Sequence, residues 1–164
     1  METKTCVENS HLLTSRFNNE TALENKDYRN KHPKLGCVYC CPEKISKDIQ
    51  PDETIYVLEM NNETNKIIGI GKSKNRTTNQ RYNIYNNNNY NRFQYIGKHR
   101  IDRSEMDDYE NNIMCVFDIL CFQGLCHQKR GQGLRRFPQK MLKNCSPILD
   151  LTLFIEEMFK KRYG

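Results

Sequence analysis

TIYVLEMNNETNKIIGIGK, residues 54–72, decides the fold because it carries the clearest secondary-structure signal of the chain. Both ends of this stretch are rich in β-branched and aromatic residues, whereas residues 61–65 between them are polar and have the length of a hairpin turn. The pattern predicts a β-hairpin. Gly69 and Gly71 alternate within its second strand. Glycines inside a strand mark a bulge, a barrel corner, or a close approach by another backbone or a ligand.

Further elements lie on both sides of the hairpin. Residues 37–40 (CVYC) and 92–96 (RFQYI) each predict a short strand. Residues 113–122 (IMCVFDILCF) form an apolar run that we expect to be a strand, although its periodicity does not decide against a helix. At the C-terminus Asp150 is a helix cap, and the apolar residues that follow share one helical face: Leu151, Phe154, Ile155, Met158 and Phe159.

The segments between these elements are polar. Asp102 can cap a short helix over 103–111, because Glu105 follows three residues later as in a capping box. Residues 82–91 are low in complexity and predict a loop, as do residues 123–140, which contain three glycines and a proline.

These elements predict an α+β fold: a small, mostly antiparallel, partly closed β-sheet or barrel with a C-terminal α-helix packed on it. Residues 1–34 have few apolar side chains and no sustained period, so we expect a loosely ordered N-terminal extension. A single domain would then cover residues 35–164.

The composition indicates a polar protein of a reducing compartment. The mean hydropathy of the 164 residues is −0.87, and neither a membrane-spanning segment nor a signal peptide is visible. We therefore expect an intracellular protein that is not secreted and has no membrane partner. Without a secretory signal the eight cysteines are expected to be mostly reduced thiols.

Charge is distributed unevenly along the chain. Residues 66–103 contain nine Lys/Arg and one acidic residue, and residues 119–149 contain six Lys/Arg and none. Since the whole chain has a net charge of +6, the remainder is acidic. Such segregation favours phosphate-bearing partners, which are bound with release of counterions. The alternative is a solvated face whose charges are balanced in three dimensions.

The sharpest local signal is the loop 127–138, HQKRGQGLRRFP. Its two glycines allow tight turns that present backbone N–H groups to an anion, and two basic pairs flank them. The GK[ST] ending of a nucleotide-binding P-loop is missing. We expect phosphate contacts from the four basic residues of this loop, which are Lys129, Arg130, Arg135 and Arg136.

A second group of candidates lies between residues 85 and 103. Aromatic residues interleaved with basic ones suit single-stranded nucleic acid, since the rings stack on bases and the charges meet the backbone. We expect Lys98, Arg100 and Arg103 to extend the phosphate contacts, with Tyr85 and Tyr90 as stacking residues.

Metal and catalytic signals are weaker. Cys37 and Cys40 have zinc-ligand spacing, and a tetrahedral site could be completed by Cys121, Cys126 and His127. Reduced buried thiols are the favoured interpretation, so we expect no metal, no cofactor and no catalytic residue. The acidic run 105–110 is expected to be a solvated face of a helix, which leaves a metal-dependent nuclease as a remote alternative.

Three stretches resemble uncharacterised proteins of large and giant DNA viruses, mimivirus relatives especially. They are residues 55–71, residues 90–103 (with YNRF and GKHRIDR) and residues 129–133 (KRGQG). This resemblance implies a viral origin, and hence the host cytoplasm or the virion as the location.

Residues 49–71 are also similar to the core hairpin of PUA-like barrels, including the EVE and YTH types. That resemblance implies a small mixed barrel that binds RNA or modified bases. YTH-type readers hold the base with tryptophans, and this chain has none.

The sequence thus predicts a non-enzymatic nucleic-acid-binding protein, with RNA placed slightly ahead of DNA, that contacts phosphates through a Gly/Arg-rich loop. The alternative is a virion structural or assembly protein whose basic face meets packaged DNA or an acidic viral protein.

Overall fold

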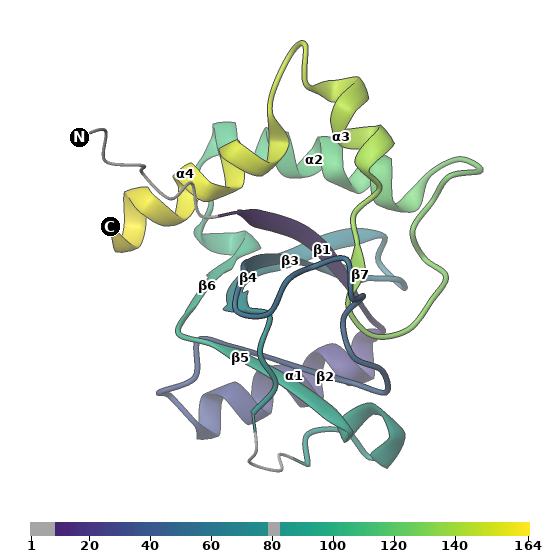
Figure 1. Cartoon of the computed structure of the whole chain (residues 1–164), viewed down its shortest axis with the longest axis vertical. Helices are drawn as coiled ribbons and strands as arrows, with labels where there is room; N and C mark the ends of the chain where they lie inside the picture. Colours follow the sequence, from purple (N-terminus) through teal and green to yellow (C-terminus); the bar gives the residue numbers. More distant parts are fainter. Residues whose placement is uncertain (1–8, 79–82) are drawn as a thin grey trace.

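The predicted hairpin lies at the centre of the computed structural model, which describes residues 9–78 and 83–164 (Figure 1). Its strands, β3 (Thr54–Asn61) and β4 (Lys66–Lys74), pair antiparallel. Their register shifts between Glu59 and Met60, which is the kind of bulge that glycines in the second strand had indicated. The hairpin prediction is confirmed.

The remaining elements form layers on both sides of this hairpin. The strands are β1 (Ser10–Phe17), β2 (Cys37–Cys41), β5 (Phe93–Gly97), β6 (His99–Asp102) and β7 (Arg135–Arg136). The helices are α1 (Asn19–Lys31), α2 (Asp108–Phe122), α3 (Gln139–Cys145) and α4 (Leu151–Tyr163), with 3₁₀ turns η1 (Asn88–Asn91) and η2 (Arg103–Glu105). One sheet has the strand order β6-β4-β3-β1-β7, and β2 pairs with β5 in a second sheet.

Two apolar cores lie on opposite faces of the five-stranded sheet. Figure 1 shows α2, α3 and α4 on one face, and β2, β5 and α1 on the other. Alternate residues of β3 belong to the two cores. Tyr56 and Leu58 pack toward the helices, whereas Ile55 and Val57 pack toward β2 and β5. The fold is α+β and mostly antiparallel, as predicted. The prediction of a partly closed barrel is wrong, because β6 and β7 are the two edges of an open sheet.

The expected loose extension over residues 1–34 is wrong for residues 10–31. β1 lies inside the sheet, in a parallel pairing with β3 that runs from Ser10–Thr54 to Phe17–Asn61. Both faces of such a strand are covered, so Leu12 and Leu13 are both buried and no polar–apolar alternation marks the strand.

The helix α1 was not predicted, for a different reason. It begins with a capping box between Asn18 and Thr21, but its fully buried residue is a polar one, Asn25. Because no apolar stripe runs along this helix, a search for apolar periodicity does not find it.

Residues 113–122 form a helix rather than the expected strand. Asp107 caps α2 and forms a capping box with Glu110. Met114, Phe117 and Cys121 are buried at spacings of three and four residues, which is one face of a helix. The acidic run is therefore partly structural, since Glu110 is buried against Arg162 of α4 at 2.7 Å.

The other local predictions hold in part. Asp102 does act as a cap, but only for the short turn η2, not for a helix over 103–111. The loop over 123–140 is confirmed except for β7 and the start of α3, and the loop over 82–91 is described from residue 83 onward. The C-terminal helix is confirmed as α4, where the Asp150 side chain accepts a hydrogen bond from the Leu153 N–H at 3.1 Å. Across residues 9–78 and 83–164, no helix combines the length and apolar character that crossing a bilayer requires.

A buried carboxylate joins the two sheets. Glu59 of β3 is 2% exposed. It accepts hydrogen bonds from the Arg100 Nη2 of β6 at 2.7 Å and from the Tyr39 hydroxyl of β2 at 2.7 Å. Both donors reach it past the glycines of β4, because a Cβ on Gly69 would lie 2.4 Å from Arg100 Nη2 and one on Gly71 would lie 2.0 Å from the Tyr39 hydroxyl. Close approach is thus the reason for both glycines.

We predict that Arg100→Met destabilises the fold by about 3–5 kcal/mol, because it leaves the Glu59 carboxylate buried without its cation. The double variant Glu59→Met/Arg100→Met should recover most of that loss, since no charge is then left unpaired in the core. Urea denaturation followed by circular dichroism measures both free energies of unfolding. A double variant that is less stable than Arg100→Met would contradict this role of the pair.

Candidate nucleic-acid interface

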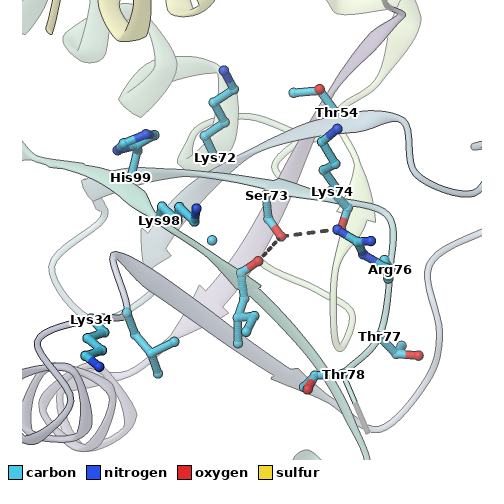
Figure 2. A pocket seen from close by; sticks show the side chains of 13 residues that line it. Lys34, Thr54, Lys72, Ser73, Lys74, Arg76, Thr77, Thr78, Lys98 and His99 are labelled. Carbon is cyan, nitrogen blue, oxygen red and sulfur yellow. Dashed lines mark hydrogen bonds between the residues drawn. The ribbon is translucent and has the colours of Figure 1, made fainter. Parts of the chain in front are cut away.

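The largest hollow described is a pocket of about 710 Å³ at the end of β4, which we call the lysine pocket (Figure 2). Its basic residues come from three segments far apart in the sequence: Lys34 before β2, Lys72, Lys74 and Arg76 on and after β4, and Lys98 and His99 at the start of β6. No carboxylate is among its lining residues, which also include Leu35, Thr54, Ser73, Thr77, Thr78, Ile96 and Gly97.

The floor of the lysine pocket is the contact between β4 and β5. The Ser73 hydroxyl donates a hydrogen bond to the Ile96 carbonyl at 2.6 Å (Figure 2). A Cβ on Gly97 would lie 2.0 Å from the Lys72 carbonyl oxygen, so glycine is required for the strands to approach this closely. On the rim, His99 stacks on Tyr163 with ring centroids 4.0 Å apart. The basic side chains therefore surround a rigid backbone contact.

Two further hollows continue from the lysine pocket. The middle groove shares Arg76 and Thr77 with it, and is lined in addition by Lys44, Ile45, Ser46, Lys47, Ile49, Pro51, Asp52, Asn75 and Tyr95. The loop pocket shares Lys44 and Ser46 with the middle groove, and is lined in addition by Arg16, Glu43, Gln128, Arg130, Gln132, Leu134, Arg135 and Arg136. Because neighbouring hollows share residues, the three are adjacent, and we call them together the basic track.

The basic track is strongly cationic. Eleven Lys/Arg residues line it: Arg16, Lys34, Lys44, Lys47, Lys72, Lys74, Arg76, Lys98, Arg130, Arg135 and Arg136. Two carboxylates also line the basic track, those of Glu43 and Asp52. Asp52 pairs with Arg76 at 3.5 Å, but both side chains are well exposed, and such pairs contribute little. Most of the positive charge thus faces solvent without a fixed counter-charge.

The predicted Gly/Arg-rich loop forms one end of the basic track. β7 pairs antiparallel with β1, and it is held between the buried side chains of Leu134 and Phe137. This anchoring leaves Arg135 and Arg136 exposed. Arg130 is exposed as well and lines the loop pocket, whereas Lys129 is half-buried and does not line it.

Seven basic residues of the track were not among the predicted contacts: Arg16, Lys34, Lys44, Lys47, Lys72, Lys74 and Arg76. Arg16 differs from the others in its surroundings. Its Nε donates to the Gln128 carbonyl at 2.6 Å and its Nη2 to the Thr14 hydroxyl at 3.1 Å. Its Nη1 is buried, with no hydrogen-bond partner in the described part of the chain. Burial, together with the nearby charge of Arg135, lowers the pKa of Arg16 to about 10. Arg16 lies in the segment that was expected to be loosely ordered, so it was not predicted as a site residue.

The other three predicted basic contacts have different environments. Lys98 is exposed and lines the lysine pocket, as expected. Arg100 instead forms ion pairs with Glu59 and Asp102. Arg103 is held by Asp118 at 3.1 Å and by the Ile67 carbonyl at 2.9 Å. These two arginines balance acidic residues inside the fold, so their assignment as phosphate contacts is corrected.

The proposed stacking tyrosines are also corrected in part. Tyr85 is buried, and its hydroxyl accepts a hydrogen bond from the Asn25 side chain at 3.1 Å. Burial raises the pKa of that phenol above its ordinary value. Tyr90 is half-buried against the same core and lines a hollow beside the loop together with Arg16, Gly131 and Gly133. Tyr85 lines that hollow as well, but it is buried there, so Tyr90 presents the more accessible ring beside the basic track.

The hypothetical zinc ligands do not assemble. Cys37 and Cys40 belong to the core beside β2, whereas Cys121 belongs to the core under α2 on the other face of the sheet. Within residues 9–78 and 83–164, no three His, Cys, Asp or Glu side chains are grouped to hold a metal. Burial raises the pKa of Cys37, Cys41 and Cys121 to about 12 each, which keeps them as thiols.

We predict that iodoacetamide at pH 8 alkylates the exposed Cys115 and Cys126 of the native protein but spares Cys37, Cys41 and Cys121. The buried thiols are inaccessible, and with raised pKa values they supply almost no thiolate. Peptide mass spectrometry measures modification site by site, and the protein unfolded in guanidinium is the control in which all five react. Rapid alkylation of the buried three in the native protein would contradict the structure.

Comparisons of the chain with protein-family models, with curated proteins and with solved structures found no match in any of the three. What the site does must therefore follow from its geometry and charge.

Proposed function

We propose that this protein binds nucleic acid along the basic track and does not catalyse a reaction on it. The observation that supports this most directly is the charge of the three adjacent hollows, where eleven Lys/Arg face two carboxylates. A polyanion bound there would release counterions from its phosphates, which is the main source of affinity in sequence-independent binding.

The exposure of the track favours contacts with the phosphate backbone. Lys34, Lys47 and Lys98 are exposed, so a phosphate can meet them without a large desolvation cost. No described helix projects from the track as a groove-reading element would, and Tyr85 is withdrawn into the core. Binding that follows backbone charge rather than base identity is the consistent expectation.

RNA remains slightly ahead of DNA in this proposal. The support is the resemblance of residues 49–71 to the hairpin of PUA-like barrels.

The alternative is an assembly protein of a large DNA virus that meets packaged DNA or an acidic viral protein. The helical layer supplies an observation in its favour, because Ile119, Leu125 and Ile148 are 54%, 104% and 93% exposed. Apolar side chains exposed in this way suit a protein that contacts other proteins as well as nucleic acid.

The test is fluorescence anisotropy with labelled single- and double-stranded RNA and DNA at two salt concentrations. Binding at low salt with a Kd of roughly micromolar or tighter is expected. A preference for single-stranded RNA would support an RNA-binding module. A steep salt dependence without strand preference would favour the assembly protein. Absence of binding to all four would refute the proposal.

A matched pair of variants tests the location. Lys34→Gln/Lys47→Gln/Lys98→Gln removes three positive charges from the track, and Lys140→Gln/Lys143→Gln/Lys160→Gln removes three from exposed positions on α3 and α4. We expect the first to weaken binding about tenfold or more and to lower the salt slope by roughly 2–3, because each phosphate contact contributes about 0.9. The second should change affinity by less than about threefold. Equal losses would mean that net charge alone drives binding.

A further inference from the structure

The loop pocket contains a half-buried cation, Arg16, that forms no ion pair with the described residues. Arg16 donates to two neutral oxygens, the Gln128 carbonyl and the Thr14 hydroxyl, while its Nη1 has no partner among the described residues. Glu43 also lines this pocket but does not form an ion pair with Arg16. The neighbouring Arg135 adds a second positive charge. A charge buried in this way is unfavourable unless a counter-charge is supplied.

The loop beside Arg16 offers backbone donors. Gly131 has φ of 113° and Gly133 has φ of 68°, whereas Arg130 and Gln132 do not have positive φ. The backbone N–H groups of residues 130–133 make no hydrogen bond within the part of the chain that the structure describes. Alternation of φ along consecutive residues turns successive N–H groups toward one side, which is the arrangement of an anion-binding nest.

The two features lie together. Arg16 and Gln132 line both the loop pocket and the adjacent hollow that contains Gly131 and Gly133. A Cβ on Gly131 would lie 2.5 Å from the Arg135 Nε, so the Arg135 side chain also lies directly against the loop. Two guanidinium groups and a run of N–H groups without partners among the described residues therefore lie around two adjacent hollows.

We propose that Arg16, Arg135 and the backbone of residues 130–133 form a seat for a single phosphate group. This inference rests on the proposed function in taking that phosphate to belong to a nucleic acid, either at its end or within its backbone. The rest of the basic track contacts phosphates through exposed, movable side chains. The seat fixes one phosphate in place, and so sets the position of the strand on the protein.

Thermal unfolding of the full chain in sodium phosphate, against sodium chloride of equal ionic strength, tests the seat. The wild type should show a saturable rise in Tm of about 3 °C or more with phosphate, because only the folded state binds it. Arg16→Gln should lose this rise, and in chloride should be at least as stable as the wild type, since the unpaired charge is gone. The control Lys140→Gln/Lys143→Gln, which removes two exposed charges of α3 outside the basic track, should keep the rise.

A second measurement does not depend on the stability of a variant. In ¹H–¹⁵N NMR spectra of the wild type, titrated inorganic phosphate should shift the amide signals of Gly131, Gln132 and Gly133 more than those of the exposed lysines of the lysine pocket. The inference is overturned if phosphate stabilises Arg16→Gln as much as the wild type. It is also overturned if the amide signals of Gly131, Gln132 and Gly133 do not shift.

Oligonucleotides with a 5′-phosphate or a 5′-hydroxyl identify the source of the phosphate. Tighter binding of the 5′-phosphate form, by fivefold or more and only with Arg16 present, assigns the seat to a strand end. Equal binding of the two forms, weakened equally by Arg16→Gln, assigns it to a backbone phosphate. If neither oligonucleotide binds although inorganic phosphate still stabilises through Arg16, the nucleic-acid proposal fails while the seat stands.

Discussion

The carboxylate of Glu59 is the group on which the rest of the structure depends. It lies in the central strand β3, and it is reached by Arg100 from β6 and by Tyr39 from β2. A buried charge must be paired and hydrogen-bonded, so these partners cannot separate without a large free-energy cost. The two-stranded sheet is thereby held against the five-stranded sheet. The lysine pocket opens where β4 and β5 meet, and its position follows from this connection.

The same pairing explains where the protein's charges are. Several acidic residues are used internally, with Glu59, Asp118 and Glu110 held by Arg100, Arg103 and Arg162. The idea that the basic stretches are balanced in three dimensions is therefore correct for those arginines. It does not hold for the hollows, where the cations outnumber the carboxylates. Acids stabilise the interior, and eleven other described cations line the basic track.

Sequence reasoning succeeded where a local pattern determines the structure. The hairpin of β3 and β4 and the Asp150-capped helix follow from residues that lie near one another in the chain. The Gly/Arg-rich loop was recognised for the same reason, because its charges and glycines are consecutive.

Sequence reasoning failed where long-range packing decides. β1 is covered on both faces, and its pairing with β3 joins residues more than forty positions apart. The apolar run of α2 suited strand or helix equally until Asp107 and Glu110 were seen to start a helix. Arg100 and Arg103 looked like surface charges because their acidic partners, Glu59 and Asp118, are distant in the sequence. Arg16 was not predicted as a site residue because it lies in a segment expected to be loose, and its partner Gln128 is distant in the sequence.

Arg16 also differs in kind from the other cations of the track. An exposed lysine contacts a phosphate wherever the strand happens to lie, so it adds affinity without fixing position. A guanidinium held by the Gln128 carbonyl and the Thr14 hydroxyl cannot follow the strand, because its own place is fixed by β1 and the loop. In the proposed complex the strand would have to move to this fixed guanidinium. A surface of mobile charges with one immobile member can therefore bind without regard to sequence and still hold the strand at a defined point.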